Sequence, residues 1–586
     1  MASSRSSLVP FLALLASSQA VTFDYVIVGG GTSGLVIANR LSELANVTVA
    51  VIEAGASVFN NPNVTDVGGY GLAFGTDIDW AYQSTNQTYA GGAKQTLRAA
   101  KAVGGTSTIN GMAYTRAEDV QVDAWELLGN AGWNWDSLLP YYLKSEDFTT
   151  PAAFQIADGV TYNPADHGTS GPLDTGYTYG MVNGTVGSTI NETYANVGIP
   201  WNSDVNGGKM RGLAAHPKTV NVIANVREDA ARAYYWPFAN RTNLVLFQST
   251  LANKLVWKNQ SDSGSVAQGV EVTTSNGTIS TIYAAKEVIL SAGALRSSLL
   301  LELSGVGNPD VLTPLNIPVV VDLPTVGENL QDQMNNAFVF GSNTTVSGTD
   351  GFVTYPSASD IFGNNTSSFA SSISSSLSTY ATAVANASNN VVSSSDLLDF
   401  FQIQYDLIFN SSVPLVEFFN TATSSIFDIE YWILLPFSRG NIHINSNNAT
   451  AAATINPNYF MLDFDLDVQV AASKFIRNTV MASAPISLEV TGETSPGTTV
   501  LPANATDAEW KEYIKGAFRS NFHPVGTAAM MPREKGGVVD TSLKVYGTSN
   551  VRVVDASVLP FQVCGHLTST LYAIAEKAAD LIKAEM

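Results

Sequence analysis

The chain has 586 residues, of which 45% are apolar and only 13% are charged. This composition excludes an intrinsically disordered protein, and the length predicts two or more domains. The formal net charge of −21 makes nucleic acids and anionic membrane surfaces poor partners.

The first twenty residues, MASSRSSLVPFLALLASSQA, predict a secretory signal peptide over 1–20. Arg5 supplies a positive start, Leu8 to Leu15 is a short apolar run, and Ser18-Gln19-Ala20 is a small-residue cleavage site. The run is well short of the ~20 residues that a membrane span needs. We therefore expect a secreted, extracellular protein without a membrane anchor.

Two further features bear on export. The only cysteine is Cys564, so no intrachain disulfide is possible. The chain also carries many N-x-S/T sequons, a density that predicts N-glycans on its surface. Among others, sequons begin at Asn63, Asn86, Asn183, Asn191, Asn259, Asn276, Asn343, Asn386 and Asn504.

The first ordered segment predicts a β-strand, a glycine turn, a helix and a second strand. Phe23 to Val28 and Thr48 to Ile52 are short apolar runs of the kind found in buried parallel strands. Between them lie a G-x-G-x-x-G motif and a helical pattern, and Glu53 follows the second strand. This order is typical of a dinucleotide-binding βαβ unit.

Each part of the motif has a physical role in binding a dinucleotide. Gly29 permits the tight turn, Gly31 lets the backbone approach a pyrophosphate, and Gly34 allows the helix to pack closely on the strand. The helix N-terminus, with Thr32 and Ser33, faces the phosphates. Glu53 is placed to bind a ribose diol and disfavours NADP, but this motif alone does not separate FAD from NAD.

Later elements are read from their apolar periodicity. Residues 366–395 are rich in serine, yet Phe369, Ile373, Leu377 and Tyr380 fall at helical spacing, which predicts an amphipathic helix. Glu287 to Leu290 and Val551 to Val554 predict buried strands. Leu571, Ile574, Ala575, Ala578 and Ile582 predict a C-terminal helix with one apolar face.

Three segments of the chain resemble the signatures of the glucose–methanol–choline (GMC) oxidoreductases. They are Arg98 to Gly111 (RAAKAVGGTSTING), Gly293 to Gly307, and Asn521 to Thr527 together with Asp555 to Ser557 and His566. Within the family the chain is most similar to the fungal FAD-dependent glucose dehydrogenases. It also resembles glucose oxidase and, more distantly, aryl-alcohol oxidase.

The resemblance implies a mixed α/β fold with a Rossmann-like FAD domain and a sheet-based substrate domain. It implies an N-terminal region over 21–334, FAD-binding with part of the substrate domain inserted, and a substrate-domain segment over 335–435. A C-terminal region over 436–586 would complete the substrate domain and return to the FAD domain with a pair of catalytic histidines.

The same resemblance implies the contacts with FAD. Besides the glycine turn and Glu53, these are Val103, Ser107, Asn110, Gly111, Met112, Ala113, Asp555 and Ala556. Some relatives attach FAD through a histidine just before the asparagine of the first signature. This chain has Ile109 there, so we expect noncovalent FAD.

Oxidation of an alcohol by a flavin requires a base for the hydroxyl proton, and histidine suits this role near neutral pH. The chain has five histidines, and the resemblance implies His523 as the base and His566 as its hydrogen-bonding partner. His167, His216 and His443 lie in no recognisable site pattern, and we interpret them as structural. No zinc-binding pattern occurs, and no metal site is predicted.

The resemblance also implies a sugar site formed by Tyr70, Glu430, Arg519 and Asn521. Arg519 and Asn521 lie four and two residues before His523, so an extended segment would direct these three side chains to one face. We therefore expect glucose to be oxidised at its anomeric hydroxyl to gluconolactone, with a quinone or similar electron acceptor.

Three alternatives remain at the level of sequence. A GMC oxidase acting on glucose or aryl alcohols with oxygen would share every motif used here. A GMC lyase or cyclase would use flavin without net oxidation, since fold does not fix function. A sugar-binding protein without activity would need neither the glycine motif nor the paired histidines.

Overall fold

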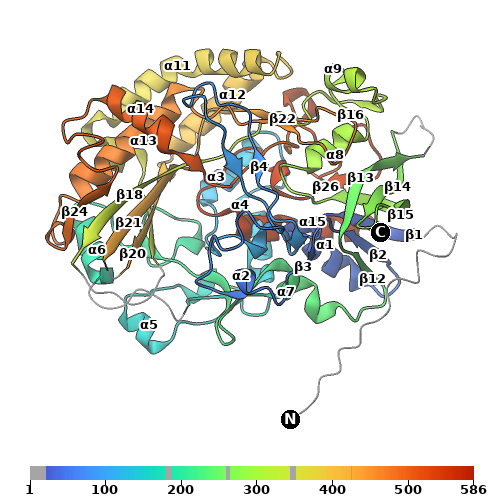
Figure 1. Ribbon diagram of the computed structural model, residues 1–586, viewed down its shortest axis with the longest axis horizontal. Helices are drawn as coiled ribbons and strands as arrows, with labels where there is room; N and C mark the ends of the chain where they lie inside the picture. The colour runs from blue at the N-terminus through green and yellow to red at the C-terminus, as the bar shows by residue number, and fades with distance from the viewer. Residues whose placement is uncertain (1–21, 179–185, 259–263, 344–350, 424) are drawn as a thin grey trace, which may run out of the picture.

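The computed structural model describes residues 22–178, 186–258, 264–343, 351–423 and 425–586. The predicted signal peptide and the sequons at Asn183 and Asn259 lie outside the described residues. Two seven-stranded sheets form the framework. Figure 1 shows the first sheet at the right of the molecule and the second at the left, with long helices above it.

The first sheet is built around β1 (Thr22–Val28), which confirms the strand predicted from its apolar run. β1 pairs in parallel with β2 (Val49–Ile52) on one side and with β15 (Ile279–Leu290) on the other. All four residues of β2 are buried, as expected of a parallel strand covered on both faces. The other strands are β12 (Leu244–Phe247), β13 (Thr250–Trp257), β14 (Ala267–Thr274) and β26 (Val551–Val553).

The first sheet combines distant parts of the chain. β26, the strand predicted near the C-terminus, pairs in parallel with the last three residues of β15. The first half of β15 instead pairs with β14 in an antiparallel ladder. The carboxyl ends of β1, β2, β15 and β26 therefore lie at one edge, where ligands of open α/β sheets bind.

Helices from both ends of the chain pack together on this sheet. α1 (Thr32–Ser42) follows the glycine turn, and α15 (Leu567–Ala584) is the predicted C-terminal helix. The two helices pack against each other. Arg40 of α1 binds the fully buried carboxylate of Glu576 in α15 through Nε and Nη2, at 2.7–2.9 Å. The start and the end of the chain thus form one unit.

The second sheet is antiparallel and lies across from the first. Its inner strands are β18 (Met334–Ser342), β21 (Ile426–Ile433) and β20 (Val416–Ala422). The remaining strands are β9 (Gly212–Ala215), β19 (Phe352–Tyr355), β24 (Val490–Ser495) and β25 (Arg519–Ser520). β9 belongs to this sheet although it precedes residue 334, which fits an insertion into the N-terminal region; the predicted domain boundaries themselves stay a prediction.

Four helices lie beside the second sheet: α11 (Thr366–Ala387), α12 (Ser394–Phe409), α13 (Asp463–Phe475) and α14 (Asp507–Ala517). α11 confirms the helix predicted from the serine-rich segment, with Ile373, Leu377 and Tyr380 buried. Its serines form the exposed face, so a small polar surface covers an apolar stripe. In the part of the chain that the structure describes, no helix has the length and apolar character to cross a bilayer.

A small third sheet is formed by strands that lie between β2 and β12 in the chain. It contains β7 (Glu146–Phe148), β8 (Leu173–Gly176), β10 (Lys218–Asn221) and β11 (Val226–Arg227). β10 follows β9 after only His216 and Pro217. β11 leads directly into the short helix α7 (Ala230–Tyr234), which packs on α1.

Candidate active site

A cavity of about 470 Å³ runs from the glycine turn after β1 to the two histidines near the C-terminus. Gly29 is at φ +107°, and a Cβ there would lie 2.2 Å from the carbonyl oxygen of Ser291. Gly105, at φ +56°, lies against the same turn, and its Cβ would come within 2.5 Å of Gly31 Cα. Both positions require glycine because two backbones meet there.

The turn leaves polar groups available at one end of the cavity. Gly31 precedes α1 without a side-chain cap, so amides of the first helical turn are available to an anion. Glu53 lines the cavity and accepts hydrogen bonds from Gly30 N at 2.9 Å and Gly55 N at 2.7 Å. Burial raises the pKa of Glu53 to about 7, although these two amides oppose the shift.

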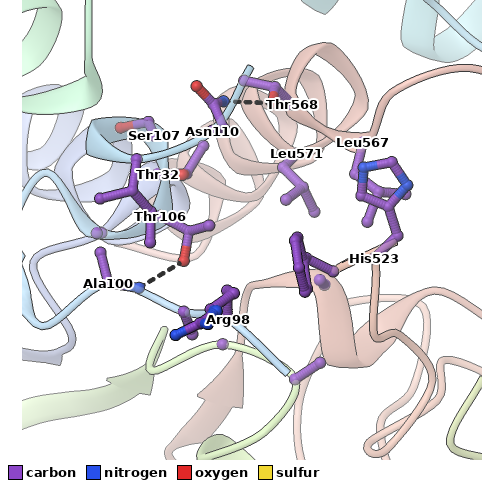
Figure 2. A pocket seen from close by; sticks show the side chains of 18 of the residues that line it. Thr32, Arg98, Ala100, Thr106, Ser107, Asn110, His523, Leu567, Thr568 and Leu571 are labelled. Carbon is purple, nitrogen blue, oxygen red and sulfur yellow. Dashed lines mark hydrogen bonds between the residues drawn. The ribbon is translucent and has the colours of Figure 1, made fainter. Parts of the chain in front are cut away.

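The segment of the first signature forms one wall of the cavity. Ser107, Asn110, Gly111, Met112 and Ala113 all line it, as predicted. Asn110 Nδ2 donates to Thr568 Oγ1 at 3.2 Å, and this contact joins the wall to the first turn of α15. Figure 2 shows this pair, with His523 in the same pocket.

Two predicted cofactor contacts do not line the cavity. Val103 is buried in a two-stranded ladder, β3 (Ala56–Ser57) with β6 (Ala102–Val103), behind the wall. Gly34 is where α1 meets the turn: a Cβ there would lie 2.0 Å from Gly29 O. Val103 therefore supports the wall from behind, and Gly34 serves packing alone, which was its predicted role.

Asp555 and Ala556 line the cavity on the side of β26. Asp555 accepts hydrogen bonds from Gly293 N at 2.9 Å and from Ser297 Oγ at 2.5 Å. It thereby connects the second and third signature segments. Burial raises the pKa of Asp555, against the opposing effect of these hydrogen bonds.

The cavity fits FAD. Its glycine end offers close backbone approach and free amides for a pyrophosphate, and Glu53 offers carboxylate oxygens for a ribose. Its other end is lined by Asn110, Met112 and the histidines, with room for a fused ring. The glycine turn, the wall formed by the first signature segment, and Asp555 would hold FAD from three sides.

His523 and His566 lie together at the far end of the cavity. Their ring centroids are 5.6 Å apart, and the ring planes make an angle of 87°. His523 Nδ1 lies 2.8 Å from Gln333 Oε1 and 3.1 Å from Asn521 Nδ2. Burial, together with the neighbouring His566 and Arg519, lowers the pKa of His523 to about 3, so its imidazole is neutral at physiological pH.

His566 is held from the opposite side. Its Nε2 lies 2.9 Å from Glu417 Oε1, on β20, and its backbone nitrogen donates to Thr115 Oγ1. Glu417 has no solvent-exposed side-chain surface. The aromatic rings of Phe419 and Trp432, edge-on at 6.4 and 6.0 Å, complete the surroundings of His566.

Three of the four predicted sugar residues, Glu430, Arg519 and Asn521, are connected by one polar network. Arg519 Nη2 lies 2.8 Å from Glu430 Oε2, and Asn335 Nδ2 donates to Glu430 Oε2 at 3.2 Å and to Asn521 Oδ1 at 2.8 Å. Tyr70 is 48% exposed and lines the mouth. Arg519 is not among the cavity-lining residues, and it reaches the site through Glu430.

The prediction that residues 519–523 form one extended segment is wrong. β25 ends at Ser520, and Phe522 adopts a left-handed φ of +62°. Asn521 and His523 come together because the chain turns between them, while Arg519 remains on the strand beside β18. The Phe522 ring packs edge-on against Phe74 at 5.6 Å, and this contact accompanies the turn.

Four residues that hold the predicted ones in place could not be named from the sequence: Gln333, Asn335, Glu417 and Arg227. Gln333 directly precedes β18, and Asn335 is the second residue of this strand, which begins with a cluster of amide side chains. Glu417 is an acid within the apolar run of β20. Both patterns are visible in the sequence, although their partners are not.

The other three histidines do not line the cavity. His167 lies between Glu146 and Asp204, and His443 between Glu302 and Glu328. His216 is buried with neither ring nitrogen hydrogen-bonded among the described residues. Over the same residues, no group of three or more histidine, cysteine or acidic side chains is arranged to hold a metal ion.

The chain is similar in sequence to members of one known enzyme family. Sequence models of the GMC oxidoreductase family match residues 23–335 and 436–575. A glucose oxidase-like protein from Humicola fuscoatra is 45% identical, over 96% of this chain and 95% of its own length. A glucose oxidase from Aspergillus carbonarius is 36% identical, over 98% of this chain and 94% of its own.

Solved structures show the same relationship. An FAD-dependent oxidoreductase from Chaetomium thermophilum has a TM-score of 0.85 and 29% identity, covering 96% of this chain and 99% of its own. A fungal aryl-alcohol oxidase has a TM-score of 0.82 and 26% identity, with the same coverage.

Proposed function

The chain belongs to the GMC oxidoreductase family, and from that premise we propose that it oxidises the anomeric hydroxyl of glucose to gluconolactone and passes the electrons to a quinone-type acceptor. It is a flavoprotein oxidoreductase with FAD as cofactor. The donor, the acceptor and the roles of individual residues are the proposal.

The observation that carries the proposal is the geometry at His523. His523 Nδ1 has two amide neighbours: Gln333 Oε1 at 2.8 Å, which can only accept, and Asn521 Nδ2 at 3.1 Å, which can only donate. We assign the proton to Nδ1 because Gln333 Oε1 is the nearer of the two, and Nε2 then keeps a lone pair. With a pKa lowered to about 3, the ring stays neutral and is ready to accept a proton. We assign His523 Nε2 as the base for the sugar hydroxyl.

His566 assists from the other side of the same space. The carboxyl of Glu417 orients its ring through Nε2, so its Nδ1 remains available to the substrate hydroxyl. Bound FAD supplies the hydride acceptor at its N5 atom. The protein's own part is to hold the sugar, orient the hydroxyl and receive its proton.

The polar network beyond the histidines supports a sugar as substrate. Glu430 accepts hydrogen bonds, Arg519 donates them, and Asn521 does both. A ligand lacking one hydroxyl would leave a buried polar group without a partner, at a cost of about 1–3 kcal/mol. Epimers and deoxy sugars should therefore be poor substrates, with xylose the best of the alternatives because it lacks only the exocyclic arm.

The choice of a quinone over oxygen rests on the segment Arg519-Ser520-Asn521-Phe522-His523, with Tyr70 and Glu430, which resembles the glucose dehydrogenases. The second candidate is a glucose oxidase, which is favoured by the names of two relatives. Both candidates share the reductive half of the reaction and differ only in how FAD is reoxidised.

A substrate panel tests the proposal. Turnover of glucose, xylose, 2-deoxyglucose, galactose and benzyl alcohol is measured with benzoquinone under nitrogen, and again with oxygen alone. We expect the highest kcat/KM for glucose with benzoquinone. Comparable turnover with oxygen would make the protein an oxidase, and a preference for benzyl alcohol would overturn the sugar assignment. Yellow protein that none of these alcohols bleaches would support a lyase.

We also propose that the protein is secreted and N-glycosylated. The segment at 1–20 supports export, and exposed sequon asparagines at Asn86, Asn276, Asn386 and Asn504 support glycans. N-terminal sequencing of protein from the culture medium should begin near Val21. Mass spectrometry after enzymatic deglycosylation should find aspartate at occupied sequons.

A further inference from the structure

Arg227 is a fully buried arginine directly behind the cavity wall. Its Nη1 donates to Asn110 O and Asn110 Oδ1, both at 2.7 Å, and to Ser107 O at 3.3 Å. Its Nε donates to Val64 O at 2.8 Å, in α2 (Pro62–Thr65). One guanidinium thus joins the wall at Ser107 and Asn110 to the segment that leads to Tyr70.

Among the described residues no carboxylate forms an ion pair with Arg227, although the nearby Asp229 favours its charge from a longer distance. Its hydrogen-bond partners there are carbonyl or amide oxygens, and no carboxylate lies within ion-pair distance. Of the adjacent acids, Glu228 has its pKa raised to about 9, mainly by burial, so it is neutral at pH 7. Asp229 accepts from Ala231 N and Arg232 N and lies 3.4 Å from Arg232 Nε.

Arg227 also decides how the Asn110 amide is oriented. A guanidinium can only donate, so Asn110 Oδ1 must face Arg227, and it also accepts from Met112 N at 3.1 Å. The amide nitrogen consequently faces Thr568 Oγ1 and the cavity. Figure 2 shows Asn110 in this position beside Thr568. Met112 N also only donates and supports the same orientation, and Arg227 makes the shorter of the two contacts with Asn110 Oδ1.

We propose that Arg227 is a positioning residue for FAD: it helps to fix Asn110 with the amide nitrogen toward the cofactor, and it places a buried positive charge behind the wall that the isoalloxazine would contact. Two-electron reduction adds negative charge to this ring system, so a cation behind the wall favours the reduced form. The proposal rests on FAD binding and not on the sugar or the acceptor.

Two substitutions separate the charge from the hydrogen bonds. Arg227→Met removes both, and Arg227→Lys keeps the charge but cannot reach Val64 and Asn110 with one planar group. We expect Arg227→Met to bind FAD at least tenfold more weakly. We also expect its preference for reduced over oxidised FAD to fall about tenfold, which moves the two-electron midpoint potential about 30 mV to more negative values. Arg227→Lys should keep the parental potential and bind FAD more weakly.

The measurements need neither sugar nor acceptor. FAD affinity is measured by fluorescence titration of the apoprotein, and the potential by reduction in the presence of a reference dye. The matched control is Arg241→Met, which removes a half-buried guanidinium that donates to Asn39 O and Ser42 Oγ and does not line the cavity. It should keep the parental potential. A shift in Arg241→Met as large as in Arg227→Met would overturn the proposal, as would parental affinity and potential in Arg227→Met.

A second variant keeps the test decisive if Arg227→Met does not fold. Asn110→Asp preserves the shape of the wall and brings a carboxylate to the guanidinium, which neutralises its charge without removing a buried residue. We expect its midpoint potential to be more negative than that of the parent. An unchanged or more positive potential in folded, FAD-loaded Asn110→Asp would overturn the proposed effect of the charge.

Discussion

The Nε2 atom of His566 lies 2.9 Å from Oε1 of Glu417, a carboxyl group without exposed surface. The second oxygen of this carboxyl has no hydrogen-bonding partner among the described residues. Glu417 is therefore committed to His566, and the pair forms the back of the site that faces His523.

Glu417→Gln keeps the shape of the side chain and removes its charge. A hydrogen bond to a charged group contributes about 1.5–3 kcal/mol, so we expect flavin reduction by glucose to slow about tenfold or more. Anaerobic stopped-flow at 450 nm measures this rate. Glu328→Gln is the control, because Glu328 contacts His443 outside the cavity; a similar loss there would argue against a specific role for Glu417.

His523→Ala removes the proposed base. General-base catalysis contributes about 10²–10⁴-fold, so we expect flavin reduction by glucose to fall at least 10²-fold while FAD content stays near the parental value. The ratio of absorbance at 450 and 280 nm checks the cofactor. An FAD-loaded variant that is reduced at the parental rate would refute the assignment.

The pH dependence of the reductive step should reflect the depressed pKa of His523. Burial lowers this pKa to about 3, so the ring remains a neutral base at every pH above that value. We expect the limiting rate of flavin reduction by saturating glucose to stay level between pH 8 and pH 5. A fall with a midpoint near 6.5, the ordinary value for histidine, would contradict the prediction.

Because of His443, the free energy of unfolding should depend on pH in the neutral to alkaline range. Burial alone would lower its pKa, but hydrogen bonds to Glu302 and Glu328 raise it to about 10, above the unfolded value of about 6.5. The stabilisation is therefore fully present below pH 6.5 and is lost as pH rises toward 10. The Tm difference between the parent and His443→Gln should be largest at pH 6 and shrink by pH 9.5. A constant difference would exclude this coupling.

The cofactor should be released without breaking a covalent bond. Ile109 stands where some relatives carry the histidine that links the flavin, and it offers no nucleophile. We expect acid precipitation to leave all the yellow colour in the supernatant. Flavin absorbance in the washed pellet would mean covalent attachment elsewhere on the chain.

The fold could be predicted where neighbouring residues determine it. The βαβ unit at the N-terminus and the helix α11 are set by local periodicity, and the structure has both within a few residues of the prediction. The turn at Phe522 could not be predicted in this way, because its left-handed backbone accompanies packing against Phe74, far away in the sequence.

The candidate site likewise contains residues that could be predicted from the sequence and residues that could not. His523, His566 and Asn110 lie in signature segments and could be named from them. Gln333, Glu417 and Arg227 come from separate parts of the chain, and each acquires its role only through a partner more than a hundred residues away. A single sequence carries no trace of such pairings, so the groups that orient the site were found only in three dimensions.

The pairing of β15 with both β1 and β26, and of α1 with α15, has a consequence for biosynthesis. At about 5–20 residues per second, roughly 30–120 s separate the first strand from the last helix on the ribosome. Until the end of this interval, the N-terminal unit lacks α15, which packs on α1. The nascent chain must be shielded until translation ends, and a premature stop after residue 550 would yield a protein unable to retain flavin.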